Sequence, residues 1–280
     1  MAINIREGYE FIVDYYQPGD RIFLFGFSRG AYSARSLPGI IYKCGILRCG
    51  HRHRIPQAFN LYKNRNKQDQ ADPFKQSYCW LQSNNDGIQP AVHLVGVWDT
   101  VSALGFPLAP VRSLNPFSKR WYGFHDAYLH HNVAHGYQAL SIDDQRKIFH
   151  PHLWKERALE GQVMEQVWFS GVHANIGGGY RRSGLSDLAL EWMVTKAVAA
   201  GLLLWGDQQQ RVLRSADATG KIYDSRAGVG KVYLPQLRTI PSGAKIHHSV
   251  VERLADSDSH YDPQNLPTNY QRVDNDGPVS

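Results

Sequence analysis

Cysteine is scarce in this sequence of 280 residues, which contains only Cys44, Cys49 and Cys79. Three cysteines are too few, and too odd in number, for a disulfide framework, so we expect free thiols in a reducing compartment. Two of them lie near His51 and His53, and zinc prefers thiolate and imidazole ligands. Their spacing fits a zinc site poorly, however, so the sequence predicts neither a metal site nor a cofactor.

Long apolar runs and targeting signals are also missing. The longest nearly uninterrupted apolar run, residues 197–205, is far shorter than the roughly 20 residues that span a bilayer. The first residues contain no basic leader, apolar core or small-residue cleavage site. The sequence therefore predicts no transmembrane helix and no signal peptide. We expect a cytoplasmic location in the producing cell, with any export by a non-classical route.

Internal repeats and low-complexity tracts are absent, and 42% of the residues are hydrophobic and 20% charged. This composition is typical of a folded globular protein and excludes a fibrous or disordered chain. The net charge of +6 suits an anionic partner such as a phospholipid surface. The densest basic stretch, residues 43–67, contains no recognition motif for nucleic acid, so nucleic acid is not an expected partner.

Four short, mostly apolar segments have the pattern of strands buried on both faces of a parallel sheet: 21–26, 92–98, 137–142 and 166–172. Apolar residues at helical spacing predict helices over 5–16 and 31–42, the second bent near Pro38, and a further helix from a cap at Ser186 or Asp187 to near Gly201. This alternation predicts one α/β domain over residues 1–280, with a mainly parallel sheet and helices on both faces.

Three regions lack such patterns. Residues 50–90 are polar and weakly periodic, which indicates an excursion from the framework. Residues 103–135 are rich in proline, glycine and aromatic residues, as expected of a lid-like insertion. Residues 256–280 are expected to form an irregular tail.

The motif Gly26-Phe27-Ser28-Arg29-Gly30 lies between a predicted strand and a predicted helix. In an α/β-hydrolase such a turn raises the serine above the carboxyl edge of the sheet, and small flanking residues let the strand and helix approach closely. The motif alone is a weak signal. Its position between strand and helix makes Ser28 the expected nucleophile; an ordinary glycine-rich turn is the competing interpretation.

A serine hydroxyl needs a base, and the base needs an anionic partner that orients it. His173 and Asp99 each directly follow a predicted strand, which places them at the same edge of the sheet as Ser28. The order serine, aspartate, histidine is that of α/β-hydrolases. Asp143 follows the next strand and competes for the role of acid, unless it forms an ion pair with Arg146. His173 and Asp99 have competing interpretations as well: a purely structural role for His173 and a helix-capping or loop-organising role for Asp99.

Several linked motifs resemble the catalytic domain of type VI secretion phospholipase effectors of the first class. These motifs follow one another over nearly the whole chain, at residues 24–32, 96–101, 168–173, 177–180, 184–187 and 261–267. The resemblance implies an α/β-hydrolase fold and hydrolysis of a phospholipid carboxylic ester. It also implies that Ser28, Asp99 and His173 carry the reaction, and that a type VI secretion component is a partner.

Two features depart from the family pattern. Asn175 stands where the glycine-rich motif after the histidine usually has an aspartate, which removes a charge close to the base. Family members also have strands well upstream of the serine, whereas only a short segment precedes Ser28. We therefore expect an N-terminally truncated sheet, a complementing N-terminal segment as a partner, and the backbone N–H of Arg29 as the remaining oxyanion-hole donor.

These observations support three hypotheses. The first is a serine esterase or lipase that acts on phospholipids through an acyl-enzyme, with peripheral membrane contact by the aromatic segment 106–124 and its basic residues. The second is a truncated, catalytically weak relative that serves as a binding or accessory protein, or a gene remnant. The third is a different acyl hydrolase, such as a peptidase or thioesterase, which differs only in its pocket.

Overall fold

The computed structural model describes residues 2–64, 68–80, 92–101, 128–155, 158–206 and 215–275. Six strands in these ranges form one sheet, in which every pairing is parallel and the strand order follows the chain. Because the strands are parallel, their carboxyl ends share one edge of the sheet. The strands are β1 (Phe23–Phe27), β2 (Val92–Trp98), β3 (Val133–Ser141), β4 (Val163–Phe169), β5 (Lys245–His247) and β6 (Gln271–Val273).

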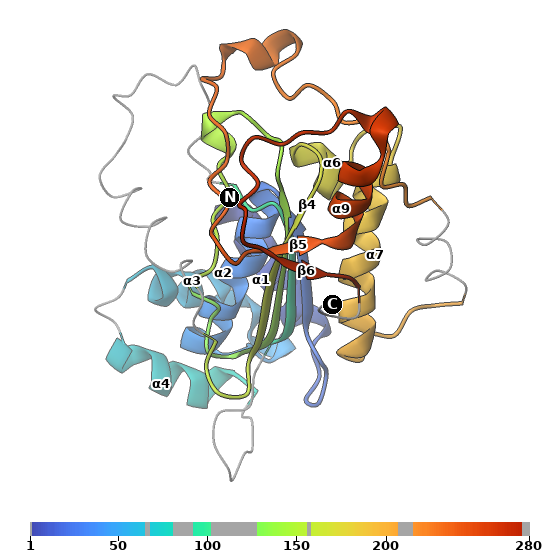
Figure 1. Ribbon diagram of the computed structural model, residues 1–280. Coiled ribbons are helices and arrows are strands. Elements are labelled where there is room, and N and C mark those ends of the chain that lie inside the picture. Colours follow the sequence, from blue (N-terminus) through green and yellow to red (C-terminus); the bar gives the residue numbers. More distant parts are fainter. Residues whose placement is uncertain are drawn as a thin grey trace.

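Helices cover both faces of the sheet, with α1 and α2 on one face and α7 on the other (Figure 1). The α-helices are α1 (Ala2–Tyr15), α2 (Arg29–Cys44), α3 (Ile55–Lys63), α4 (Gln68–Tyr78), α6 (His173–Gly177), α7 (Gly184–Ala199) and α9 (His248–Ala255). Short 3₁₀ helices are η1 (Cys49–Arg54), η4 (Lys147–Phe149), η5 (Gly228–Val232) and η6 (Ser257–Ser259). The expected α/β class, with a parallel sheet between two helical layers, is confirmed.

Burial on both faces explains the apolar pattern of β2, whereas the expectation of such burial was wrong for β1, an edge strand in which Phe25 is exposed. On β2, Val95 and Val97 face the core beneath α1 and α2, while Leu94 faces the core beneath α7. The α7 side is filled by Trp192 and Met193, which are fully buried. A strand covered on both sides needs apolar residues at successive positions, which is the pattern read from residues 92–98.

The observed boundaries differ from the predicted ones by a few residues. Residues 92–98 form β2 as predicted, whereas β3 begins four residues earlier than expected and β4 three. The missed starts contain residues that interrupt an apolar pattern, namely His135 and Gly136 in β3 and Glu165 in β4. The helix α2 continues through Pro38, where the sequence predicts a bend or an interruption.

The excursion expected over residues 50–90 contains two helices, since 55–63 and 68–78 form α3 and α4. Polar and basic neighbours obscured a short amphipathic helix, since α3 buries Ile55, Ala58, Phe59, Leu61 and Tyr62. The expected tail over 256–280 contains β6, which pairs with β5. The expected lid over 103–135 lies mostly outside the described residues, and its last residues, 133–135, begin β3.

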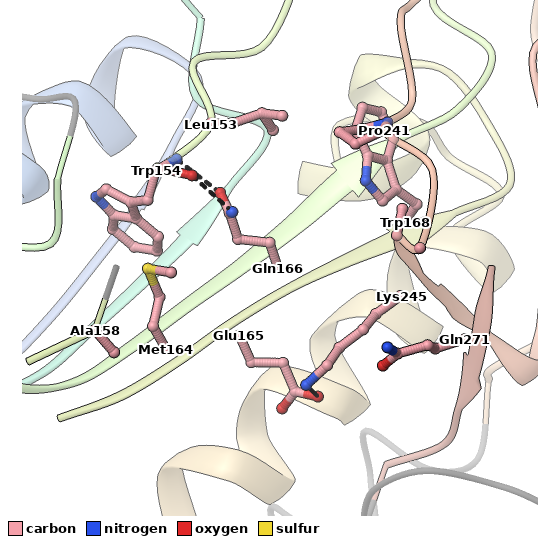
Figure 2. Close-up of a pocket in the computed structure, with 12 residues that line it drawn as sticks. Leu153, Trp154, Ala158, Met164, Glu165, Gln166, Trp168, Pro241, Lys245 and Gln271 are labelled. Atoms are coloured by element: carbon pink, nitrogen blue, oxygen red, sulfur yellow. Dashed lines mark hydrogen bonds and ion pairs between the residues drawn. The ribbon is translucent and has the colours of Figure 1, made fainter. Parts of the chain in front are cut away.

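A pocket of about 410 Å³ lies beside β4, where the short strand β5 pairs with only two of its residues (Figure 2). Trp154 and Trp168 form part of its wall. The Gln166 side chain bonds both the N–H and the carbonyl of Trp154, and Glu165 pairs with Lys245 at 3.1 Å. None of the predicted site residues lines this pocket, so it is separate from the candidate site.

Candidate active site

Ser28 occupies the turn between β1 and α2. Its backbone angles, φ 59° and ψ −121°, lie outside the regions that L residues commonly adopt, at a cost on the order of 1–3 kcal/mol. Its N–H donates to the Trp98 carbonyl at 3.0 Å, which keeps the end of β1 paired with the end of β2. The strained turn therefore presents a partly exposed serine side chain at the carboxyl edge of the sheet.

The two glycines around Ser28 have different roles. A Cβ added at Gly26 would lie 2.5 Å from the carbonyl oxygen of Gly30, while nothing lies within 4 Å of a Cβ at Gly30. The close approach of β1 to α2 therefore requires glycine at position 26. It does not require glycine at position 30, although the sequence suggested that small residues on both sides of Ser28 allow the approach.

This difference predicts opposite effects for two alanine substitutions. Gly26→Ala is expected to destabilise the protein by about 1–3 kcal/mol, because the added methyl group meets backbone atoms. Gly30→Ala is expected to leave stability unchanged or to raise it by about 0.5–1 kcal/mol, because the position is exposed in α2 and alanine favours a helix. Chemical unfolding of both variants measures the difference; equal unfolding midpoints would contradict the steric argument.

His173 lies between Ser28 and Asp99. Its Nε2 atom is 2.8 Å from Ser28 Oγ, and its Nδ1 atom is 2.5 Å from Asp99 Oδ2. The three residues follow β1, β2 and β4, so the common edge of the sheet brings these sequence-predicted residues together. When Nδ1 carries the proton and donates it to the carboxylate, the lone pair of Nε2 points at the serine hydroxyl. This geometry suits transfer of the serine proton to the imidazole.

Asp99 is fully buried and hydrogen-bonded through both carboxylate oxygens. The Ser141 N–H donates to Oδ1 at 3.0 Å, and Arg238 donates through Nη1 to Oδ1 at 2.5 Å and through Nη2 to Oδ2 at 2.8 Å. Burial alone would raise the pKa of Asp99, but the Arg238 guanidinium, assisted by His173, holds this pKa well below its ordinary value. Asp99 is therefore a carboxylate throughout the neutral range.

Asp144 fixes the backbone that carries the histidine. Its Oδ2 atom accepts a hydrogen bond from the N–H of His173 at 3.1 Å. The same carboxylate, which is fully buried, pairs with Arg146 at 2.6 Å. The ion pair that the sequence suggested between Asp143 and Arg146 is thus formed by the neighbouring aspartate.

Asp143, the competing acid, contacts other groups. Its carboxylate accepts hydrogen bonds from the Gly171 N–H at 2.5 Å and from the Tyr261 hydroxyl at 3.0 Å. Burial raises its pKa to about 6, although these two hydrogen bonds oppose the rise. The His173 ring bonds to Asp99 instead, so the geometry favours Asp99 as the partner of the imidazole.

Aromatic side chains surround the histidine. The rings of Phe27 and Phe149 lie 4.5 and 5.1 Å from the His173 ring, centroid to centroid. A Cβ at Gly177 would lie 2.0 Å from the Phe27 ring, so the chain after the histidine packs directly on that ring. Phe27 also lines a pocket of about 440 Å³, whose wall includes the apolar side chains of Phe25, Trp98, Ile176 and Leu190 and the polar side chains of Ser183, Ser186 and Asp187.

Arg29, the expected oxyanion donor, is the first residue of α2. Its backbone N–H is therefore one of the first four in the helix, which have no partner within the helix. Such a donor directly after the nucleophile suits the oxygen of a tetrahedral intermediate.

Asn175, which stands where the family pattern usually has an aspartate, bonds to the Val172 N–H and the Lys221 carbonyl. These two bonds stabilise the turn after β4.

The cysteines and histidines near the end of α2 form no metal site in the described ranges, where no group of three or more His, Cys, Asp or Glu side chains could hold a metal ion. Cys44 and Cys79 are buried free thiols, and burial raises the pKa of each to about 12. Neither is therefore a thiolate near neutral pH. Among all the residues that the structure describes, no helix combines the length and apolar character needed to cross a bilayer.

Arg238 is the site residue that sequence reasoning missed. It lies between α7 and β5, outside any described helix or strand and outside the motifs, 139 residues from Asp99. An arginine in a polar, irregular segment looks like a surface residue. Only the fold shows that its side chain is buried beside the carboxylate.

The fold and the arrangement at its edge define an α/β protein of the hydrolase-like kind. A family model described as the type VI secretion phospholipase effector Tle1-like catalytic domain matches residues 1–196. The chain belongs to this family, which confirms the resemblance read from its motifs. The family is one of phospholipase effectors of the type VI secretion system.

A curated protein of Saccharomyces cerevisiae is also similar. Uncharacterized protein YEL023C is 31% identical over 112 residues, which cover 36% of this chain and 16% of that protein. The chain thus spans about a sixth of the length of this relative. No solved structure matches the chain.

Proposed function

We propose that this chain is a serine esterase that hydrolyses carboxylic esters of phospholipids. Ser28 is the nucleophile, His173 the general base and Asp99 the acid that orients the base. The observation that carries the proposal is the unbroken hydrogen-bonded series from Ser28 Oγ through the imidazole to Asp99. Membership in a family of phospholipase effectors supports the substrate class.

In the first half-reaction, Ser28 Oγ attacks the ester carbonyl carbon while His173 Nε2 takes the serine proton. The Arg29 N–H stabilises the developing oxyanion. The tetrahedral intermediate collapses by breaking the bond between the carbonyl carbon and the alcohol oxygen. The imidazolium gives its proton to that oxygen, the alcohol portion of the lipid leaves, and the acyl group remains on Ser28.

In the second half-reaction, water attacks the acyl-enzyme and gives its proton to the same imidazole. Collapse returns the proton to Ser28 Oγ and releases the fatty acid. Throughout both steps Asp99 stays ionised, holds the Nδ1 proton and stabilises the imidazolium. The buried carboxylate suits this role, since Arg238 keeps its pKa low.

The pocket beside Phe27 is lined mainly by apolar groups, although Ser183, Ser186 and Asp187 also contribute to its wall, and it supports an acyl substrate over a polar one. It adjoins the residue directly before the nucleophile, and its wall includes Phe25, Trp98, Ile176 and Leu190. Removing an acyl chain from water into such a pocket contributes about 0.8 kcal/mol per buried methylene group. A peptide or thioester of a short polar acid would gain little there.

The test uses vesicles of phosphatidylethanolamine and phosphatidylglycerol incubated with the purified chain in ¹⁸O-labelled water. We expect fatty acid and lysophospholipid as products, with ¹⁸O in the fatty acid carboxyl group, because water attacks the acyl carbon. Mass spectrometry identifies both. A released phosphorylated headgroup, or ¹⁸O in the lysophospholipid, would instead indicate phosphodiester cleavage or attack at the alcohol carbon and contradict the proposal.

A further inference from the structure

Arg238 connects the acid of the proposed site to two other parts of the fold. Besides its two bonds to Asp99, its guanidinium donates to the Ser141 carbonyl at 2.9 Å through Nη1 and to the Phe149 carbonyl at 2.7 Å through Nη2. Ser141 is the last residue of β3, and Phe149 is the last residue of η4. The Phe149 ring lies against His173. The guanidinium thus ties the acid to the chain segments that border the base.

This arginine comes from a part of the chain that the family match does not include. The match ends at residue 196, and Arg238 lies 42 positions further on, before β5. The Asn265 side chain donates to the Arg238 carbonyl at 3.0 Å and to the Ile142 carbonyl at 3.1 Å. These contacts fix the segment that carries the arginine against the end of β3.

The charges explain why such a cation matters here. Asp99 has no solvent exposure, and a buried carboxylate without a counter-ion tends to take up a proton. A protonated Asp99 would neither hold the Nδ1 proton of His173 nor stabilise the imidazolium. In the described chain, the charged or titratable groups that bond directly to Asp99 are Arg238 and His173; the Asp144–Arg146 pair and Asp143 lie on the neighbouring loop.

We propose that Arg238 is a positioning residue of the active site, whose forked guanidinium keeps the Asp99 carboxylate charged and aimed at Nδ1 of His173. The segment beyond the family match thereby completes the catalytic machinery. This inference rests on the proposed function of Ser28, His173 and Asp99.

Substitution of Arg238 separates its charge from its shape. Arg238→Met removes both, so the strongest opposition to the effect of burial is lost and the pKa of Asp99 rises. The loss of a nearby positive charge also favours the imidazolium, which cannot accept the serine proton. Both effects move the acidic limb of the pH profile of kcat/KM upward. Arg238→Lys keeps the charge but not the paired hydrogen bonds, so its limb stays near that of the wild type.

The experiment measures kcat and KM for a short-chain nitrophenyl ester from acidic to neutral pH. For Arg238→Met we expect the shifted limb. For both variants at neutral pH we expect a lower kcat with little change in KM. The decrease in kcat should be about 10²-fold if Asp99 is displaced by about 1 Å. Arg35→Met is the matched control. Arg35 is also buried, and its partners include Gln138 and the His152 carbonyl, so its removal should leave the limb in place.

A readout without turnover separates this inference from the proposed function. In Ser28→Ala protein, the far-downfield proton resonance of His173 Nδ1–H reports its hydrogen bond to Asp99. Adding Arg238→Met should abolish this signal or make it titrate at higher pH. A wild-type chain without esterase activity would sink the proposed function and leave this measurement intact.

The inference fails if folded Arg238→Met protein keeps both the wild-type limb and the wild-type resonance. If that variant does not fold, Arg238→Lys decides: a reduced kcat supports the positioning role, and a kcat equal to that of the wild type overturns it. The double variant Asp99→Asn with Arg238→Met removes both buried charges. It should melt at a higher temperature than Arg238→Met alone, because no unpaired carboxylate remains.

Discussion

Ser28→Ala is expected to lower kcat for ester hydrolysis by on the order of 10⁶, the loss typical when a nucleophile is removed from a serine triad. His173→Ala should cost a similar factor, because the hydroxyl then has no group to accept its proton. The double variant should be no worse than either single one, since the two residues act as a unit. Turnover of a short-chain nitrophenyl ester measures all three.

Covalent labelling gives an independent measure of the same prediction. A fluorophosphonate probe should attach to Ser28, because only an activated serine reacts at a useful rate, and peptide mass spectrometry locates the adduct. Ser33→Ala is the matched control: Ser33 lies one helical turn further along α2, and its hydroxyl bonds to the Arg29 carbonyl at 3.4 Å. Full labelling of folded Ser28→Ala protein, or loss of labelling in Ser33→Ala, would contradict the assignment.

The common edge of the sheet explains why much of this site could be predicted. Asp99 directly follows an apolar segment that is buried on both faces, and Ser28 directly follows the apolar edge strand β1, in which Phe25 is exposed. A parallel sheet brings the ends of such segments together. His173 follows β4 by a short turn, in which Gly171 has a φ of 114°. The candidate residues could therefore be found from the apolar segments that precede them, a pattern that the sequence carries locally.

Features that depend on contacts between distant segments could not be predicted in this way. Asp143 and Asp99 both follow strands, and the choice between them depends on side-chain direction: Asp143 contacts Tyr261, and Asp99 contacts the imidazole. The short helix α3 packs against α2 through a face that its polar surroundings conceal in the sequence. Local periodicity contains no information on such pairings.

Asp99→Asn is expected to lower kcat by about 10⁴, the loss seen when the acid of a serine triad becomes an amide. The surroundings of Asp99 explain why neither orientation of the side-chain amide matches the hydrogen-bond donors around it. Both carboxylate oxygens accept from Arg238, Oδ1 also accepts from the Ser141 N–H, and Oδ2 also accepts from His173. In either orientation the amide NH₂ therefore meets donors in a fully buried position.

If the NH₂ group takes the place of Oδ2, it faces His173 Nδ1 and stabilises the tautomer whose proton sits on Nε2. That tautomer cannot accept the proton of Ser28. If it takes the place of Oδ1, it opposes the Ser141 N–H and one Arg238 nitrogen, and the buried unpaired donors destabilise the fold by about 1–3 kcal/mol. Stopped-flow and steady-state turnover at neutral pH, together with thermal melting, distinguish the two arrangements.

Asp143→Asn is the matched control, because its surroundings accommodate an amide. The remaining oxygen can accept from the Gly171 N–H, and the NH₂ group can donate to the Tyr261 hydroxyl oxygen. We expect this variant to fold and to keep kcat within about tenfold of the wild type, the difference that corresponds to about 1.4 kcal/mol. If Asp143→Asn instead abolishes turnover while Asp99→Asn remains active, the acid is Asp143. The bonds between Asp99, Arg238 and His173 would then have only a structural role.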